Sequence, residues 1–227
     1  MQRFLILLIC CFSTIGLFAQ TNNYRKAADS DPEALKIVRA IKAKYEGYTA
    51  MQADFRLDIE FPGQAVETQK GQLSRNGDKF HFKLATQEGI SDGEAIYVIM
   101  HDNKSVNIEN MPEPGDDAGM LTPQNLLTFY DEEKFVFALQ GEENLKGKIV
   151  QIIELKPVDR DESEFTKIRM LVDKKSQQVV QLLAFSRDGS RFTFHLDTLK
   201  VNPSLPSSLF AFQKSDYEGY YIEDLRF

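Results

Sequence analysis

Residues 51–61 read MQADFRLDIEF, an unbroken alternation of apolar and polar side chains. Successive side chains of a β-strand point to opposite faces, so this alternation is typical of a strand with one buried face. The apolar members are Met51, Ala53, Phe55, Leu57, Ile59 and Phe61. The segment therefore predicts a long, half-buried strand.

Turn signals divide the rest of the chain into short strands with near-regular spacing. Pro62-Gly63 ends the first strand, and Asn76-Gly77 is a strong hairpin signal. Further strands are expected at 66–75, 80–84, 95–100, 106–108, 135–139, 148–155, 165–172, 179–185 and 191–199, with at least one more short element in the tail 209–225. The pattern predicts about ten or eleven strands.

Two helices are expected. Asp31 is a good cap and Pro32 suits a first helical turn, so a helix begins there. Its apolar stripe consists of Ala34, Ile37, Val38, Ile41 and Tyr45. After an acidic loop at 112–119, Thr122-Pro123 predicts a short helix that carries Leu126, Leu127 and Phe129.

These elements predict a mainly β fold with helices (α+β). Short connections favour antiparallel neighbours, and one long helix is too small to cover so wide a flat sheet. We therefore expect the sheet to curl into a barrel, with an apolar cavity under the helices. The candidate lining residues are Met51, Phe55, Leu57, Ile59, Phe61, Phe80 and Phe82, and Leu126, Leu127 and Phe129 are candidates for a lid.

The first 19 residues have the features of a secretory signal peptide. Arg3 precedes an apolar run from Phe4 to Phe18, and Ala19 is a small residue at the expected cleavage point. Both cysteines, Cys10 and Cys11, lie in this segment, so the mature protein is expected to be exported, soluble, cysteine-free and not lipid-anchored. Residues 20–30 are expected to be a flexible polar segment, and 31–227 a single domain.

Charge and side-chain chemistry argue against several function classes. The formal net charge is −7, which argues against nucleic acid and anionic membrane surfaces as partners. The three histidines, His81, His101 and His195, show no metal-ligand spacing, and residues 141–148 read as a turn between strands and not as a phosphate loop. Acidic residues gather in loops, and none is expected on an otherwise apolar strand face. We expect no metal, no cofactor and no enzymatic activity.

Several short motifs, taken in order, resemble the LolA family of outer-membrane lipoprotein carriers. The helix beginning at Asp31 leads into the 51–61 strand, as in that family. The remaining motifs are Lys70-Gly71-Gln72-Leu73, Ile90-Ser91-Asp92-Gly93, Thr122-Pro123-Gln124-Asn125-Leu126-Leu127, Asp188-Gly189-Ser190-Arg191-Phe192 and Leu209-Phe210-Ala211-Phe212. Their order and spacing extend over nearly the whole mature chain.

The resemblance implies an unclosed barrel whose helices form a lid over a hydrophobic cavity. It also implies a periplasmic, monomeric carrier. Such a carrier receives acylated lipoproteins from an inner-membrane ABC transporter, LolCDE, and delivers them to an outer-membrane acceptor of the LolB type. One position departs from the family: Gly77 stands where an arginine that holds the lid is expected, and Arg75 lies two residues earlier. We therefore assign no lid-holding residue from the sequence.

The fold class alone leaves a second function open. Lipid-sensing envelope regulators and scaffolds use the same fold, because a fold does not fix a cargo. A sensor usually carries a second domain, for which this chain is expected to have no room.

Overall fold

The structure is a computed structural model that describes residues 27–111, 132–161 and 163–226. The expected signal peptide and the expected lid residues Leu126, Leu127 and Phe129 lie outside these ranges. The helical elements are η1 (Ala27–Asp29), α1 (Pro32–Glu46), η2 (Ser207–Phe210) and η3 (Lys214–Tyr217). None of these helices is long and apolar enough to cross a bilayer.

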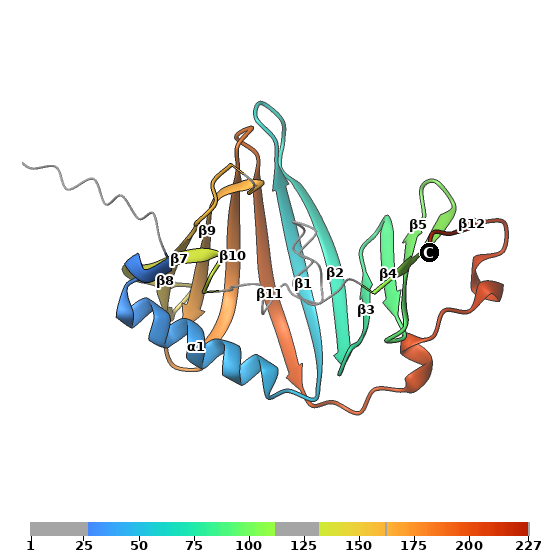
Figure 1. The fold of residues 1–227 in the computed structure, drawn as a ribbon, viewed down its shortest axis with the longest axis horizontal. Coiled ribbons are helices and arrows are strands. Elements are labelled where there is room, and N and C mark those ends of the chain that lie inside the picture. The colour runs from blue at the N-terminus through green and yellow to red at the C-terminus, as the bar shows by residue number, and fades with distance from the viewer. Residues whose placement is uncertain (1–26, 112–131, 162, 227) are drawn as a thin grey trace, which may run out of the picture.

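Twelve strands form a single sheet. They are β1 (Ala50–Glu60), β2 (Glu67–Asn76), β3 (Lys79–Lys83), β4 (Gln87–Ser91), β5 (Ala95–Met100), β6 (Ser105–Asn110), β7 (Phe135–Leu145), β8 (Lys148–Pro157), β9 (Phe165–Asp173), β10 (Gln178–Ser186), β11 (Arg191–Val201) and β12 (Tyr221–Asp224). Their order across the sheet is β12-β6-β5-β4-β3-β2-β1-β11-β10-β9-β8-β7. The sheet is unclosed, as expected, because β12 and β7 are its two edges (Figure 1).

The expected strand count of ten or eleven was too low. β4 was missed because its sequence, QEGIS, contains a glycine and lacks an alternating pattern. β12 has only four residues and pairs with β6 in the parallel direction, whereas antiparallel neighbours were expected. β7 continues to Leu145 through an irregularity at Leu139/Gly141, so much of the stretch 141–148 is strand and not turn.

Helix α1 forms as its sequence predicts. The Asp31 side chain accepts a hydrogen bond from the Glu33 N–H at 2.8 Å, and Pro32 occupies the first turn. Four residues of the apolar stripe are fully buried: Ala34, Val38, Ile41 and Tyr45. They join one cluster with side chains of β1, β2 and β7–β11. Burial of a side chain such as Ile41 stabilises the fold by about 1.5–3 kcal/mol.

We call the sheet face that carries Met51 and Phe55, against which α1 packs, the inner face. The opposite face, which carries Asp54 and Arg56, is the outer face. In Figure 1, α1 crosses the lower ends of the strands, while the β1–β2 and β10–β11 hairpins project side by side at the top. A Cβ built on Gly189 would lie 3.3 Å from Pro62 Cγ, so the tips of these two hairpins are in contact.

The N-terminal part of the described chain protects an edge of the sheet. The Phe137 N–H donates to Ser30 Oγ at 3.1 Å, and the Asp31 N–H donates to the Phe137 carbonyl at 2.8 Å. These bonds occupy backbone groups of the edge strand β7 that would otherwise be free to pair with another chain. Of the expected flexible segment 20–30, residues 27–29 form η1.

A second apolar core lies on the outer face. Ile90, Ile99 and Val106 are buried there beneath the C-terminal tail that connects β11 to β12. Two tail residues stack on the sheet, with Tyr97 and Phe212 ring centroids 4.5 Å apart and Phe212 and Tyr217 centroids 5.2 Å apart. The tail, red in Figure 1, therefore packs over β4–β6 on the outer face, while α1 packs on the inner face across the lower ends of the strands in the other half of the sheet.

Candidate functional site

The seven candidate lining residues lie on the inner face. The β1–β2–β3 register pairs Met51 with Arg75 and Arg75 with Phe80, so these side chains point to the same side. Phe82 lies on this side as well, because it pairs with Leu73, which in turn pairs with Ala53. The structure thus brings the predicted residues of β1 and β3 to the same face of the sheet. The intervening strand β2 adds Leu73 and Gly71 to this face, and also the polar residues Arg75, Gln69 and Glu67.

Exposure rises steadily along β1. Met51 is 2% exposed and Phe55 is 7% exposed, because both belong to the cluster beneath α1. Leu57 and Ile59 are half-buried, and Phe61 is 41% exposed. The inner face is therefore closed at the α1 end and accessible at the hairpin end.

Two glycines on the inner face are covered by phenylalanine rings from the neighbouring strand. Phe82 pairs with Gly89, and a Cβ at Gly89 would lie 2.0 Å from the Phe82 ring. Phe55 covers Gly71 in the same way. Each ring occupies the space above the glycine that a side chain at that position would fill.

Sequence reasoning missed part of this surface. Ile96, Val98 and Met100 of β5 are half-buried, and the pairing of Val98 with Gly89 places them on the inner face. Their strand reads AIYVIM and is apolar on both faces, because its other face packs under the tail. The continuous apolar sequence of β5 was the available signal, but only its register with β4 shows which side chains lie on the inner face.

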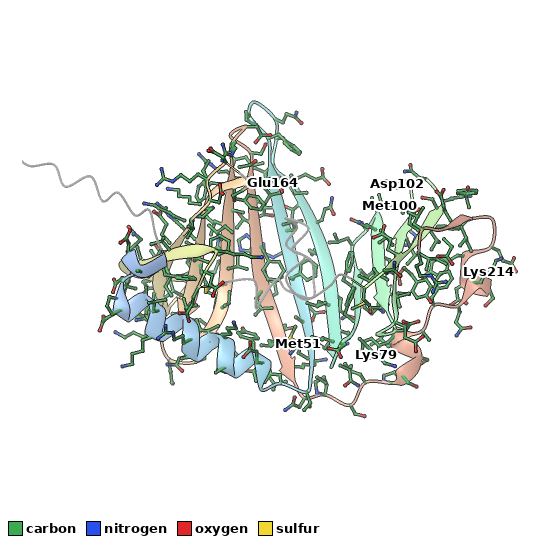
Figure 2. All side chains as sticks on the ribbon, viewed as in Figure 1. Met51, Lys79, Met100, Asp102, Glu164 and Lys214 are labelled. Atoms are coloured by element: carbon green, nitrogen blue, oxygen red, sulfur yellow. The ribbon has the colours of Figure 1, made fainter. Side chains whose placement is uncertain are left out.

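Three aromatic rings line the hairpin end of the inner face. Phe61 and Phe192 ring centroids are 6.4 Å apart, and Phe192 and Phe165 centroids are 6.3 Å apart. Both pairs are edge-to-face, the arrangement that aromatic pairs favour. Figure 2 labels Glu164, the neighbour of Phe165, at the top of the sheet and Met51 at the bottom of β1.

Arg75 fixes the opposite end of the site. Its Nη2 donates to the Tyr45 carbonyl at 2.9 Å and to the Tyr48 carbonyl at 3.2 Å. The first of these is a carbonyl of the last turn of α1, where a cation also interacts favourably with the helix dipole. Burial lowers the pKa of Arg75 from its usual value. The sequence assigned no such role to Arg75, because its bonding partners are backbone groups distant in the chain.

Arg39 ties α1 to the chain that precedes β7. Its Nε and Nη2 donate to the two carboxylate oxygens of Glu132 at 2.7 and 2.6 Å. This bidentate geometry is the strongest arrangement for an arginine–carboxylate pair. Helix α1 is thus bonded at Arg39 as well as packed against the sheet.

The three histidines have carboxylate or hydroxyl partners. His81 and His195 lie on the outer face, opposite the phenylalanines. His81 Nε2 is 2.6 Å from Glu88, and His195 Nε2 is 2.9 Å from Asp58. His101 Nε2 is 3.4 Å from the second Glu88 oxygen, and its Nδ1 is 3.0 Å from the Tyr220 hydroxyl.

The expectation that no acidic residue stands on an otherwise apolar strand face was wrong for Glu88, which pairs with the buried Ile99. Glu88 and Glu154 are each 6% exposed on the outer face. Burial raises the pKa of Glu88, but the hydrogen bond from His81 and the nearby cations outweigh it, so this pKa lies below its usual value. Glu154 is held by Arg169, Lys156 and Lys167 at 3.2–3.5 Å. Neither buried carboxylate was predicted, because His81 reaches Glu88 from β3, and Lys167 and Arg169 reach Glu154 from β9.

The described residues offer this site apolar surface and little reactive chemistry. Among the residues that the structure describes, no three His, Cys, Asp or Glu side chains converge in a way that could hold a metal ion. The histidine–carboxylate pairs lie on the outer face and not beside the inner-face phenylalanines. The inner face is suited to bind an apolar group by burial of its surface.

The sequence profile of one family, described as outer membrane lipoprotein carrier protein LolA, matches residues 46–213. This is well over half of the chain. The chain belongs to the LolA family. LolA proteins are carriers of lipoproteins and not enzymes. The matched range includes the inner-face strands and ends before η3 and β12.

Individual relatives are distant from this LolA protein. An uncharacterized protein of Methanocaldococcus jannaschii is 24% identical over 212 residues, which are 91% of this chain and 57% of that protein. The chain thus spans little more than half of that relative's length. An uncharacterized conserved protein from Thermus thermophilus has a similar structure, with a TM-score of 0.55, 8% identity and coverage of 85% of this chain and 99% of the other. A putative outer membrane lipoprotein-sorting protein domain from Vibrio parahaemolyticus gives a TM-score of 0.45 at 16% identity, with coverage of 82% and 98%.

Proposed function

We propose that this LolA-family protein binds the acyl chains of lipoproteins on its inner face and carries them from the inner to the outer membrane. The observation that supports this most is the graded inner face. Apolar side chains are fully buried at Met51, half-buried at Ile59 and exposed at Phe61, on a surface that the described helix covers only at one end.

The energetics of this surface suit reversible binding. Each buried methylene of an acyl chain contributes about 0.8 kcal/mol. Full enclosure of two or three chains would hold the cargo too tightly for release. A face whose far end remains accessible buries the chains only in part, which favours a carrier that must also unload.

The proposal includes partners and a location. The segment 1–19 supports export, so we propose the periplasm as the site of action. The donor would be an inner-membrane ABC transporter of the LolCDE type, and the receiver an outer-membrane acceptor, of the LolB type or of another kind. We propose a monomer, since residues 30 and 31 already bond to the edge strand β7.

Release of a labelled lipoprotein from inner-membrane vesicles tests the carrier role. The protein should bring the lipoprotein into the soluble fraction in an ATP-dependent manner, and mass spectrometry should find acylated cargo with the purified complex. Bound lipid without release of lipoprotein would contradict the carrier role and favour a lipid-sensing regulator.

A further inference from the structure

We propose that acyl chains enter the inner face at the hairpin end of β1, past Phe61 and Phe192, and that the α1 end is closed. This inference rests on the proposed function and assigns a direction of entry to the same site.

The first argument is the contrast between two residues on paired strands. Phe61 follows β1 at the hairpin end, and Val201 pairs with Met51 at the α1 end. Their exposed fractions are nearly the same, 41% and 40%. Inward from Phe61, the next inner-face residues, Ile59 and Leu57, are half-buried, whereas Met51, next to Val201, is 2% exposed. An apolar path therefore leads inward along β1 from Phe61, with Glu67 and Gln69 of β2 at its side, whereas the side chains behind Val201 are already buried.

The second argument is what closes the α1 end. Tyr45 is fully buried there, and its ring lies 5.4 Å from the Tyr48 ring in an edge-to-face contact. Arg75 donates to the backbone carbonyls of both tyrosines. An acyl chain that entered here would have to break these bonds and leave the half-buried Arg75 guanidinium without these acceptors, which is costly.

The third argument is the composition of the hairpin end. Phe61, which follows β1, contacts Phe192 of β11, and Phe192 contacts Phe165 of β9. An acyl chain can slide past such hydrocarbon rings without breaking a polar bond to them. Val66, on the same β1–β2 connection as Phe61, is 56% exposed. The Pro62–Gly189 contact joins the two hairpin tips at this end. The exposed apolar tip thus continues directly into the half-buried inner face.

The chain contains no tryptophan, so a single introduced tryptophan reports on its own position. We would prepare Phe61→Trp and Val201→Trp and mix each with a fatty acid brominated at mid-chain, which quenches tryptophan on contact. The proposal predicts strong, saturable quenching of Phe61→Trp and little quenching of Val201→Trp. Equal quenching at both positions, or stronger quenching at Val201→Trp, would overturn it.

A second pair of variants tests the direction of entry by uptake kinetics, without an introduced tryptophan. Phe61→Ser should slow uptake of a fluorescent fatty acid about tenfold, which corresponds to about 1.4 kcal/mol in the barrier. The matched control Val201→Ser should take up the probe at the wild-type rate. A slowed Val201→Ser with an unchanged Phe61→Ser would place the entry at the α1 end. Absence of saturable binding in the wild-type protein would instead contradict the proposed function itself.

Discussion

The Phe55 ring lies directly over the backbone of Gly71, its partner on the neighbouring strand. A Cβ built on Gly71 would lie 2.3 Å from Phe55 Cζ and 2.9 Å from Leu84 Cδ2. Phe55 is also packed against Phe194, with ring centroids 5.0 Å apart. The Phe55 ring is therefore held between Gly71 and Phe194, and this position of the ring requires a residue without a side chain at position 71.

Gly71→Ala should destabilise the protein by about 1–3 kcal/mol, the usual cost of overpacking a well-packed core. The midpoint of urea unfolding checks this value. A midpoint equal to that of the wild type would show that the ring can move aside.

A double-mutant cycle with Phe55→Leu tests whether the two residues are coupled. Leucine is shorter and leaves room for the added methyl group, so the double variant should be more stable than the sum of the single effects predicts, by about 0.5–3 kcal/mol. Additive effects would indicate that Gly71 is required for a reason other than the Phe55 ring.

Arg75→Met should destabilise the fold, because the Tyr45 and Tyr48 carbonyls would lose the half-buried guanidinium as a donor. The Tyr45 carbonyl keeps the bond from the Tyr48 N–H at 3.3 Å, so the expected loss is about 1–3 kcal/mol, for the Tyr48 carbonyl. The increase in hydrogen-exchange rate caused by Arg75→Met should be larger at the C-terminal turn of α1 than elsewhere in the protein.

Arg56→Met is the matched control for this prediction. Arg56 pairs with Asp197 on the outer face at 3.0 Å, where both side chains are substantially exposed. Such pairs contribute about 0–1 kcal/mol. Equal destabilisation by the two variants would contradict a special role of Arg75.

Glu88 should make the stability of the tail sensitive to acid. Its folded-state pKa lies below the ordinary value of 4.5, so the charged form favours the folded state. This contribution is present above pH 4.5 and is lost as the pH falls through the lower folded-state pKa. Unfolding curves from about pH 7 to about pH 3 should show a smaller acid-dependent loss in Glu88→Gln than in the wild type. The same loss in both proteins would exclude Glu88 as a source of the acid sensitivity.

Tyr217 should have the opposite pH dependence at the alkaline end. Burial and the nearby Glu88 carboxylate raise its pKa to about 12, from an ordinary value of 10.0. The neutral phenol favours the folded state, so its contribution is present below pH 10 and is lost as the pH rises toward 12. Tyr217→Phe keeps the ring that stacks on Phe212 and should lose less stability between pH 10 and pH 12 than the wild type does. An unchanged alkaline loss would contradict this assignment.

The parts of the fold that the sequence predicts are those with a regular local pattern. The alternation at 51–61 places β1 within one residue of its observed bounds, and the Asp31 cap and apolar stripe do the same for α1. Asn76-Gly77 likewise forms the expected turn between β2 and β3, with Gly77 at a φ of 59°. In each case the signal lies within a few neighbouring residues.

The parts that escape prediction depend on contacts between distant segments. Phe212 and Tyr217 sit in a tail without periodicity, and their packing on Tyr97 becomes visible only in three dimensions. Glu88 looks like an exposed residue in a short polar stretch, but His81 and His101 reach it from other parts of the sheet. For the site, sequence predicts which residues alternate, whereas the register decides which strands contribute to the same face.

The most direct test of the account is acyl-chain binding by variants that place one charge on either face of the sheet. Ile59 is half-buried on the inner face, and Gln181, opposite His195, is half-buried on the outer face. A fluorescent fatty acid titrated into the wild type and Gln181→Asp should bind saturably with the same affinity. Ile59→Asp should fold but bind at least about tenfold more weakly, because a carboxylate in an apolar contact surface costs more than about 1.4 kcal/mol. Equal binding by Ile59→Asp and the wild type would contradict the claim that the inner face holds the cargo.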